Sequence, residues 1–141
     1  MGILNVTPDS FSDGGQFKGV QEAADFGLKM IDDGADIIDI GGESTRPGAV
    51  AVTHEEELKR IKPVIKAIRS QTDCLISIDT YKASVAEAAL DLGADLINDI
   101  SSLSYDENMA NLVSTRKVPV ILMHMQGSPQ NMQLAPSYNN L

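Results

Sequence analysis

The stretch Ile37–Ala49 reads IIDIGGESTRPGA and sets the pattern for the rest of the chain. It begins with a short apolar run, which predicts a buried strand. Two adjacent glycines then open a loop whose backbone a ligand can approach closely. Ser44, Thr45 and Arg46 add two hydroxyl donors and a planar cation that suits phosphate or carboxylate. We interpret the stretch as a strand that delivers an anion-binding loop; the alternative is a surface turn with one solvated arginine.

The same order of strand, loop and helix recurs along the chain. DDGADIIDI at 32–40 resembles DLGADLIND at 91–99, and each reads as a helix end, a glycine and a strand. Repeated units with short connections predict a parallel sheet with helices outside it. Apolar runs predict strands at 2–6, 36–40, 75–79, 96–100 and 120–124, helical spacing predicts helices within 20–31, 58–68, 85–92 and 109–113, and 126–141 reads as loop.

Composition limits the class of protein. The 141 residues carry a net charge of −9 and 43% hydrophobic residues, which predicts one globular domain over 1–141. The acidic balance argues against nonspecific nucleic-acid binding, so an anionic substrate must be captured by local groups. No apolar run approaches membrane-spanning length. Cys74 is the single cysteine, and we expect a small buried residue in a reducing compartment, the cytoplasm.

Turn and capping residues predict where the helices begin and end. Gly34 and Gly93 each follow a helical pattern and are expected at its C-terminal end. Thr53 and Glu56 have the spacing of a capping box, in which Thr53 caps and Glu56 reaches back. Thr80 is expected to cap the helix that follows the strand 75–79.

Polar side chains stand at the ends of the predicted strands. In a parallel sheet these ends share one edge, and in (β/α)₈ barrels that edge carries the active site. A carboxylate beside buried aliphatic residues is costly unless it is paired or meets a ligand. The alternative is that each side chain caps the next helix, which suits Asp99 and His124 better than Asp39. The residues concerned are Asn5, Asp39, Asp79, Asn98, Asp99 and His124.

Two of these residues suggest the kind of ligand. Asp79 and Asn98, on neighbouring strands, offer a carboxylate and an amide to a planar heterocycle with N–H and C=O edges. Ile100, Ile121 and Met123 are candidates for the apolar walls of its pocket. The alternative, which is the more common role of such positions, is that all three are ordinary core residues.

Several motifs together resemble one family, the dihydropteroate synthases of the folate pathway, which are pterin-binding TIM barrels. The resemblance runs from residue 1 to about residue 133. The motifs are MGILNVTPDSFSDGG at 1–15, GGESTRPGA at 41–49, Asp79-Thr80, Ile97-Asn98-Asp99 and LMHMQGSPQNMQ at 122–133.

The resemblance implies a fold and a reaction. The fold is an α/β (β/α)₈ TIM barrel. The enzyme is a transferase that joins 6-hydroxymethyl-7,8-dihydropterin pyrophosphate to p-aminobenzoate and releases pyrophosphate with the help of Mg²⁺. Sulfonamides compete for the p-aminobenzoate site, and the family is often homodimeric. The expected partners are therefore these small molecules, with no nucleic acid and no membrane.

The resemblance also implies roles for matching residues. Asp79, Arg46 and Asn5 are the expected catalytic residues, and Asn5 is also the expected contact to Mg²⁺–pyrophosphate. The pterin would contact Asp79, Asn98, Asp39, Ile100, Ile121 and Met123. Pyrophosphate and p-aminobenzoate would contact Thr45, Arg46, Pro47, Phe11 and His124, with Phe11 and Pro47 framing the p-aminobenzoate.

The chain departs from the family in length. A full barrel of this kind has eight strand–helix units and about 250 residues, whereas five strands are predicted here. The expectation is an N-terminal fragment with two open sheet edges. By itself such a chain should aggregate, self-associate or bind ligand weakly, with little or no activity. Two rival functions are a barrel that transfers a methyl group from methyltetrahydrofolate to a corrinoid partner, and a truncated chain without turnover.

Overall fold

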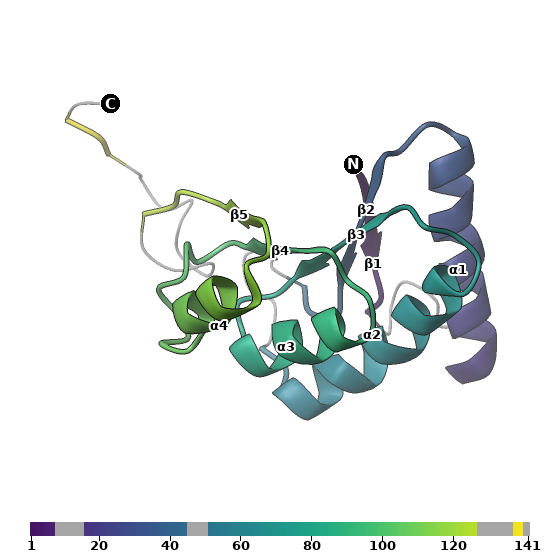
Figure 1. The fold of residues 1–141 in the computed structure, drawn as a ribbon, viewed down its shortest axis with the longest axis horizontal. Helices are drawn as coiled ribbons and strands as arrows, with labels where there is room; N and C mark the ends of the chain where they lie inside the picture. Colours follow the sequence, from purple (N-terminus) through teal and green to yellow (C-terminus); the bar gives the residue numbers. More distant parts are fainter. Residues whose placement is uncertain (8–15, 45–50, 127–136, 140–141) are drawn as a thin grey trace.

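The computed structural model describes residues 1–7, 16–44, 51–126 and 137–139. Strands and helices alternate along the chain, which confirms the repeated units expected from the sequence (Figure 1). The elements are β1 (Gly2–Asn5), α1 (Gln16–Asp32), β2 (Ile37–Gly41), α2 (His54–Arg69), β3 (Leu75–Asp79), α3 (Ala83–Asp91), β4 (Leu96–Asp99), α4 (Met109–Arg116) and β5 (Val120–Leu122).

The strands form one parallel sheet in the order β1-β2-β3-β4-β5. Each strand therefore pairs with the next along the chain, and the intervening helix packs back onto the same face of the sheet. The registers align the carboxyl ends of the strands, with Asn5 opposite Gly41, Gly41 opposite Asp79 and Asp79 opposite Asn98. This sheet is the arrangement expected of an incomplete (β/α)₈ barrel.

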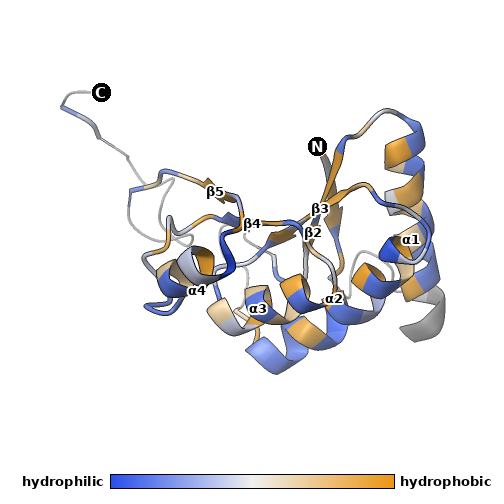
Figure 2. Ribbon diagram, in the orientation of Figure 1, coloured by the Kyte–Doolittle hydropathy of each residue, from blue (hydrophilic) through white to orange (hydrophobic). Residues whose placement is uncertain are grey.

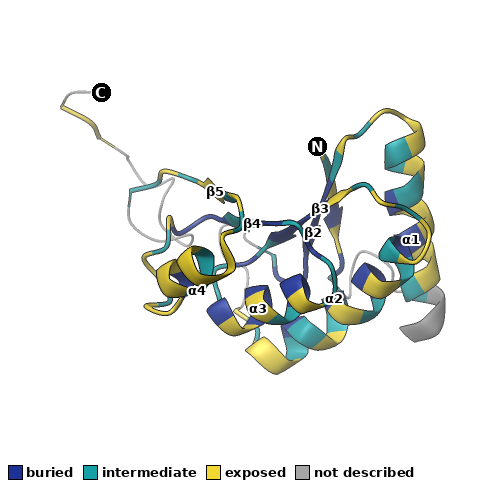
Figure 3. Cartoon of the chain, in the orientation of Figure 1, coloured by how far each residue is buried: buried dark blue, intermediate teal, exposed yellow. Residues whose placement is uncertain are grey.

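The core lies between the sheet and its helices. Side chains on the helix-facing side of the strands, among them Leu4, Ile38 and Ile78, are fully buried in one cluster with residues of α2 such as Ile61 and Ile65. Figure 3 shows buried residues in the strands and along one side of α2 and α3. The helices are amphipathic, with hydrophobic and hydrophilic residues alternating around α1, α2 and α3 (Figure 2). Within the described residues, no helix combines the length and apolar character needed to cross a bilayer.

Among the described residues, no helix covers the opposite face of the sheet. Ile3 is 62% exposed, Leu75 is 47% exposed and Ile121 is 37% exposed, and by register all three lie on this face. Apolar side chains at this exposure favour association with another surface. The expected self-association of the chain stays a prediction, and this face is where we expect it to occur.

The helix ends follow the sequence in most places. Gly34 and Gly93 have φ values of 104° and 99°, which confirms them as left-handed residues after α1 and α3. Thr53 caps α2, since its hydroxyl accepts a hydrogen bond from the amide of Glu56 at 3.3 Å. The Glu56 carboxylate instead accepts from Arg60 Nε at 3.0 Å, one turn further along the helix.

The expected cap of α3 is wrong. The helix begins at Ala83, and Thr80 lies three residues earlier, where its hydroxyl accepts from the Lys82 amide at 3.2 Å. The Ala83 amide donates to Asp106 Oδ2 at 2.8 Å instead. A carboxylate brought from the β4–α4 connection thus takes the place of a local cap, which no local pattern could show.

The last two strands are shorter than predicted. β4 ends at Asp99 and β5 ends at Leu122, so Ile100, Met123 and His124 lie beyond the strands. For β4 the physical reason is the turn after Asp99, where Ser102 and Leu103 adopt positive φ values of 54° and 64°. Such residues leave the extended conformation, and the sheet ladder ends with them.

Candidate functional site

A row of side chains crosses the carboxyl ends of the strands. Asn5, Gly41, Asp79, Asn98 and Ile121 are successive partners in the registers of the five strands, so they face the same side of the sheet. This side is the one that the helices leave uncovered. The predicted site residues that end strands therefore do come together, as parallel pairing requires.

Asp39 and Ser77 lie two residues before this row, on the same face. Asp39 is 3% exposed, and its Oδ2 accepts a hydrogen bond at 3.0 Å from the amide of Asn98, two strands away. Three buried oxygens in this part of the described structure have no hydrogen-bond partner: Asp39 Oδ1, Asp79 Oδ1 and Ser77 Oγ. Because native proteins rarely leave buried polar atoms unsatisfied, such a group of three indicates a place for a ligand with donors.

The electrostatic setting of Asp79 supports the same conclusion. Burial is the largest cause that raises the pKa of its carboxyl group, and the charges of Asp39, Glu57, Asp99 and Glu43 raise it further, to about 7. A carboxyl group poised between its protonated and ionised forms near neutral pH is typical of functional sites. It can accept a hydrogen bond when ionised and donate one when protonated.

Gly41 leaves a small hollow between Asn5 and Asp79. A Cβ atom at Gly41 would lie 3.3 Å from Asp79 Oδ2 and 3.5 Å from Asn5 Oδ1. Any side chain at this position would fill the space between the two oxygens. The glycine thus keeps the carboxyl end of β2 open to a ligand, in addition to any role in the loop.

Asp99 belongs to the fold and lies outside this site. It faces the helices and is fully buried, with Oδ1 accepting from the amide and hydroxyl of Ser101 at 2.7 Å and Oδ2 accepting from the Leu103 amide at 2.9 Å. The alternative that Asp99 caps the next helix is therefore wrong, because its carboxylate holds the turn after β4 and α4 begins ten residues later, at Met109.

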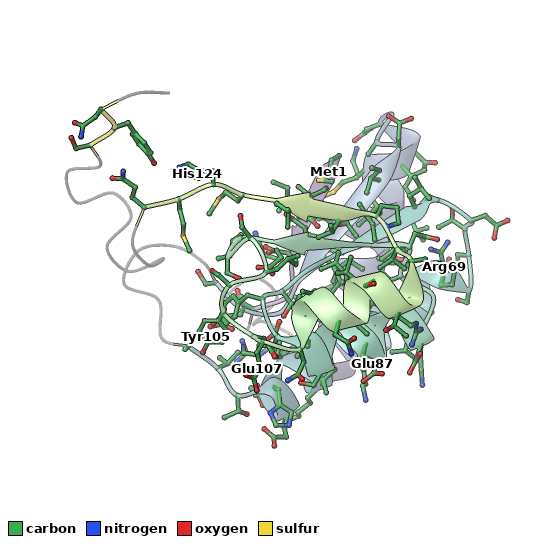
Figure 4. The ribbon with its side chains drawn as sticks, turned by 60° about the vertical axis from the view of Figure 1, so that its left-hand side comes forward. Met1, Arg69, Glu87, Tyr105, Glu107 and His124 are labelled. Carbon is green, nitrogen blue, oxygen red and sulfur yellow. The ribbon has the colours of Figure 1, made fainter. Side chains whose placement is uncertain are left out.

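The expected apolar walls are only partly gathered at the row. Ile121 lies in it, while Ile100 is 7% exposed in the turn beyond β4 and Met123 is half-buried beyond β5. His124 is exposed, and its ring centroid lies 5.5 Å from that of Tyr138. Its expected place near the diphosphate stays a prediction. Figure 4 shows His124 on the segment that leads away from β5.

Four of the predicted site residues lie outside the described residues, and their roles stay predictions. They are Phe11, Thr45, Arg46 and Pro47.

Sequence reasoning missed Ser77 and a buried group of charged residues at Glu43, Glu57 and Lys82. Ser77 carried a signal, because it is the one polar residue inside the apolar run LISI and lies two positions before Asp79. The three charged residues come from separate segments, so no local pattern connects them.

The chain is similar in sequence to proteins of known family. The family model described as pterin binding enzyme matches residues 1–141. Dihydropteroate synthase of Synechocystis sp. is 50% identical over 141 residues, which make up 100% of this chain and 49% of that protein. The enzyme of the same name from Streptococcus pyogenes is 57% identical over 126 residues, or 89% of this chain and 47% of that protein.

Solved structures agree in fold. A Clostridium difficile dihydropteroate synthase in the presence of pteroic acid aligns with a TM-score of 0.87 and 48% identity over 99% of this chain and 50% of that chain. A Xanthomonas albilineans dihydropteroate synthase with 4-aminobenzoic acid aligns with a TM-score of 0.86 and 49% identity over 98% of this chain and 48% of that chain.

A third structure, a Yersinia pestis dihydropteroate synthase in complex with a sulfonamide drug, gives a TM-score of 0.88 at 49% identity, over 99% of this chain and 50% of that chain. The chain spans about half the length of the relatives it matches. The expected fold class and family resemblance are thereby confirmed, and the chain belongs to the family of pterin binding enzymes.

Proposed function

We propose that the protein carrying this chain is a dihydropteroate synthase. It would condense 6-hydroxymethyl-7,8-dihydropterin pyrophosphate with p-aminobenzoate to give 7,8-dihydropteroate and pyrophosphate. The names of the relatives support this proposal, as do the solved complexes of relatives with pteroic acid and 4-aminobenzoic acid. The same names favour the synthase over a methyl-transferring barrel.

The observation that carries the proposal is the set of unpartnered oxygens at the strand ends. Asp79 Oδ1 and Asp39 Oδ1 are buried acceptors, and the side-chain amide of Asn98 stands beside them. The aminopyrimidine edge of a pterin presents N–H donors next to a carbonyl acceptor in one plane. Such an edge would satisfy groups that otherwise carry a desolvation penalty.

The residue types suit the reaction. The bond between the pterin methylene carbon and the pyrophosphate oxygen breaks, and pyrophosphate departs with the electron pair. The amine nitrogen of p-aminobenzoate forms the new bond to that carbon and loses a proton. Asp79, near the pterin, would hold the ring and stabilise the positive charge that develops on it. Arg46, by its sequence position after β2, would stabilise the departing anion.

Mg²⁺ is part of the proposal. The Asn5 side-chain oxygen beside the Gly41 hollow is a hard oxygen ligand of the kind Mg²⁺ prefers. The described residues contain no group of three histidine, cysteine, aspartate or glutamate side chains arranged for a metal. One amide ligand fits an ion held mainly by substrate phosphates and water, which supplies positive charge to the leaving group.

Three further expectations belong to the proposal. Sulfonamide sensitivity is supported by the drug complex of the Yersinia pestis relative. Homodimer assembly and a cytoplasmic location are supported by the family resemblance alone, and light scattering and cell fractionation would test them.

The test is product formation together with ligand binding. We expect the wild-type protein to form dihydropteroate from both substrates in the presence of Mg²⁺. Pterin binding is measured by pterin fluorescence, and Asp79→Asn should abolish it. Arg46→Ala should weaken binding only for the pyrophosphate form. Glu87→Gln, which removes an exposed carboxylate on α3, is the matched control and should leave both unchanged (Figure 4). Pterin binding by Asp79→Asn at wild-type strength would contradict the proposal.

A further inference from the structure

The hydrogen bond between Asn98 and Asp39 fixes the orientation of a side-chain amide. The Asn98 nitrogen donates to Asp39 Oδ2 at 3.0 Å. A carboxylate only accepts hydrogen bonds, whereas the amide of an asparagine has an oxygen that accepts and a nitrogen that donates. Asp39 therefore determines which end of the amide faces β2, and the oxygen of Asn98 is turned away from Asp39.

This hydrogen bond reaches across β3 near the carboxyl end of the sheet. Asp39 is the register partner of Ser77, and Asn98 is the register partner of Asp79. The bond therefore runs diagonally over β3, on the face that carries the strand-end row. Ser77, the residue of β3 beside Asp39, has a small side chain that leaves room for it.

The opposite orientation of the Asn98 amide is strongly disfavoured. Asp39 is 3% exposed, so water has little access to its carboxylate. Rotating the amide by half a turn would bring the Asn98 oxygen against this carboxylate. Two acceptors would then face each other without a donor in a buried place, which is costly.

The fixed orientation decides what Asn98 offers to a ligand. Asn98 is half-buried and belongs to the strand-end row, so a ligand lying over the row meets its oxygen as an acceptor. Asp79 Oδ1, on the neighbouring strand, is a second acceptor with no partner in the described structure. Such a site favours a ligand with N–H donors and disfavours one that places an oxygen there.

A purely structural role explains less of this arrangement. A link between β2 and β4 needs only one hydrogen bond, and an amide at position 39 would supply it in either direction. The carboxylate of Asp39 supplies it in one direction only. The acidic residue is therefore better explained by the orientation of Asn98 than by the link between the strands.

We infer that Asp39 is a positioning residue that makes the site selective for a ring bearing an amino group. Through Asn98 it presents an acceptor to the exocyclic 2-amino group of the pterin, the N–H donor that projects from the ring. The inference rests on the proposed function, because the ring concerned is that of its pterin substrate. It requires no contact between Asp39 and the ring.

The test compares 6-hydroxymethylpterin with 6-hydroxymethyllumazine, which has an oxygen in place of the 2-amino group. Dissociation constants are measured by fluorescence at about pH 7.5 in the protein that carries this chain. The wild-type protein should bind the pterin about 100-fold more tightly than the lumazine, or better. Asp39→Asn should bind the lumazine about tenfold more tightly than wild type does, because the new amide can also donate and so stabilises a rotated Asn98. Its affinity for the pterin should stay within about threefold of wild type, since the original orientation remains available.

The charge of Asp39 needs a comparison of its own. Asp39 is among the charges that raise the pKa of Asp79 to about 7, and its removal favours the ionised form of Asp79. Most of Asp79 is already ionised at about pH 7.5, so its ionised fraction should change by less than about twofold.

Asp39→Leu makes the same change in charge as Asp39→Asn but leaves Asn98 without a partner. We expect it to bind the pterin about fivefold more weakly than Asp39→Asn does, because Asn98 is no longer held in place. Asp36→Asn, the same substitution at an exposed position just before β2, is the matched control and should bind both ligands as wild type does. Circular dichroism and thermal denaturation check that each variant is folded, and each of the two Asp39 variants tests the inference if the other fails to fold.

Three results would overturn the inference while leaving the proposed function intact. The first is a wild-type protein that binds the lumazine as tightly as the pterin. The second is an unchanged ratio of the two affinities in a folded Asp39 variant. The third is equal affinities of Asp39→Asn and Asp39→Leu for both ligands, which would assign the effect to charge. A wild-type protein that binds neither ligand and forms no product would overturn the proposed function, and the inference with it.

Discussion

The amino and carboxyl edges of the sheet differ in whether their polar side chains have hydrogen-bond partners. At the amino edge, Arg69 donates to the carbonyls of Gly93, Thr72 and Cys74 and to the Asp95 carboxylate, at distances from 2.6 to 3.2 Å. Asp95 also accepts a hydrogen bond from the amide of Ile76, the second residue of β3. This group, the Arg69 cluster, joins the end of α2 to the starts of β3 and β4.

At the carboxyl edge, Asp39, Ser77 and Asp79 each keep a buried oxygen with no hydrogen-bond partner in the described structure. Figure 4 shows Arg69 on one side of the molecule and His124 and Tyr105 on the other. The Arg69 cluster at the amino edge thus completes the fold, while the carboxyl edge also holds three polar side chains that have an oxygen available for a partner. Substitutions at the two edges should therefore differ in sign and size.

The largest effect is expected at the Arg69 cluster. Arg69→Met keeps the aliphatic stem but removes every donor, and should lower the free energy of unfolding by about 3 kcal/mol or more, measured by urea denaturation. Arg116→Met is the control, because Arg116 pairs with Asp91 at the surface and its loss should cost less than about 1 kcal/mol. Equal effects of the two substitutions would show that the amino edge has no special role.

The second prediction concerns Asp99, a carboxyl-edge residue whose carboxylate has hydrogen-bond partners. Asp99→Ala should lower the free energy of unfolding by about 2 kcal/mol, because it leaves the amides of Ser101 and Leu103 unpaired in a buried turn. Urea denaturation measures this change. An unchanged free energy of unfolding would show that Asp99 does not stabilise the fold.

The third prediction is a substitution that stabilises the protein, at Asp79. The folded pKa of Asp79 is about 7 against an ordinary value of 3.8, so the folded state binds more protons between these pH values. Stability from this group is present below the unfolded pKa and is lost as the pH rises through the folded pKa. Asp79→Asn should therefore raise the free energy of unfolding at pH 8 by about 1–2 kcal/mol and have little effect at pH 4.

Denaturation of wild type and Asp79→Asn at pH 4, 6 and 8 measures this difference. Glu87→Gln, the exposed control on α3, should show no such growth with pH. If Asp79→Asn is destabilising at pH 8, the carboxylate has a partner that stabilises its charged form.

The smallest effect is expected at Ser77. Its buried hydroxyl has no hydrogen-bond partner among the described residues, so Ser77→Ala removes a desolvation penalty and should raise the free energy of unfolding by at most about 1 kcal/mol. Thermal and urea denaturation check this value. If Ser77→Ala instead lowers the free energy of unfolding as much as Asp99→Ala does, then Ser77 supports the sheet and belongs with the structural residues.

Much of the fold was predictable because it depends on local patterns. The apolar run at β3 has the predicted bounds, and Gly34 and Gly93 take the left-handed conformation that their positions indicated. The predictions that failed depend on distant residues. Asp106 replaces Thr80 at the start of α3, and the turn held by Asp99 ends β4 early.

The candidate site shows the same division. Asp79 and Asn98 were found from the sequence because parallel strands align their ends. The hydrogen bond from Asn98 to Asp39 reaches across two strands, and the ammonium of Lys82 donates to the carboxylate of Glu43, 39 residues away in the sequence. Such pairings depend on register and on where the next helix begins, which local periodicity does not encode.

By itself the sequence determined the order of strands and helices, the parallel sheet, and the strand ends that carry polar groups. It did so because hydrophobic periodicity and turn residues act over a few neighbours. Only the tertiary structure decided which polar groups are satisfied and which are left open. Hydrogen bonding and desolvation depend on neighbours brought close by folding, so Asp99 became a structural residue while Asp79 kept a raised pKa and an open oxygen.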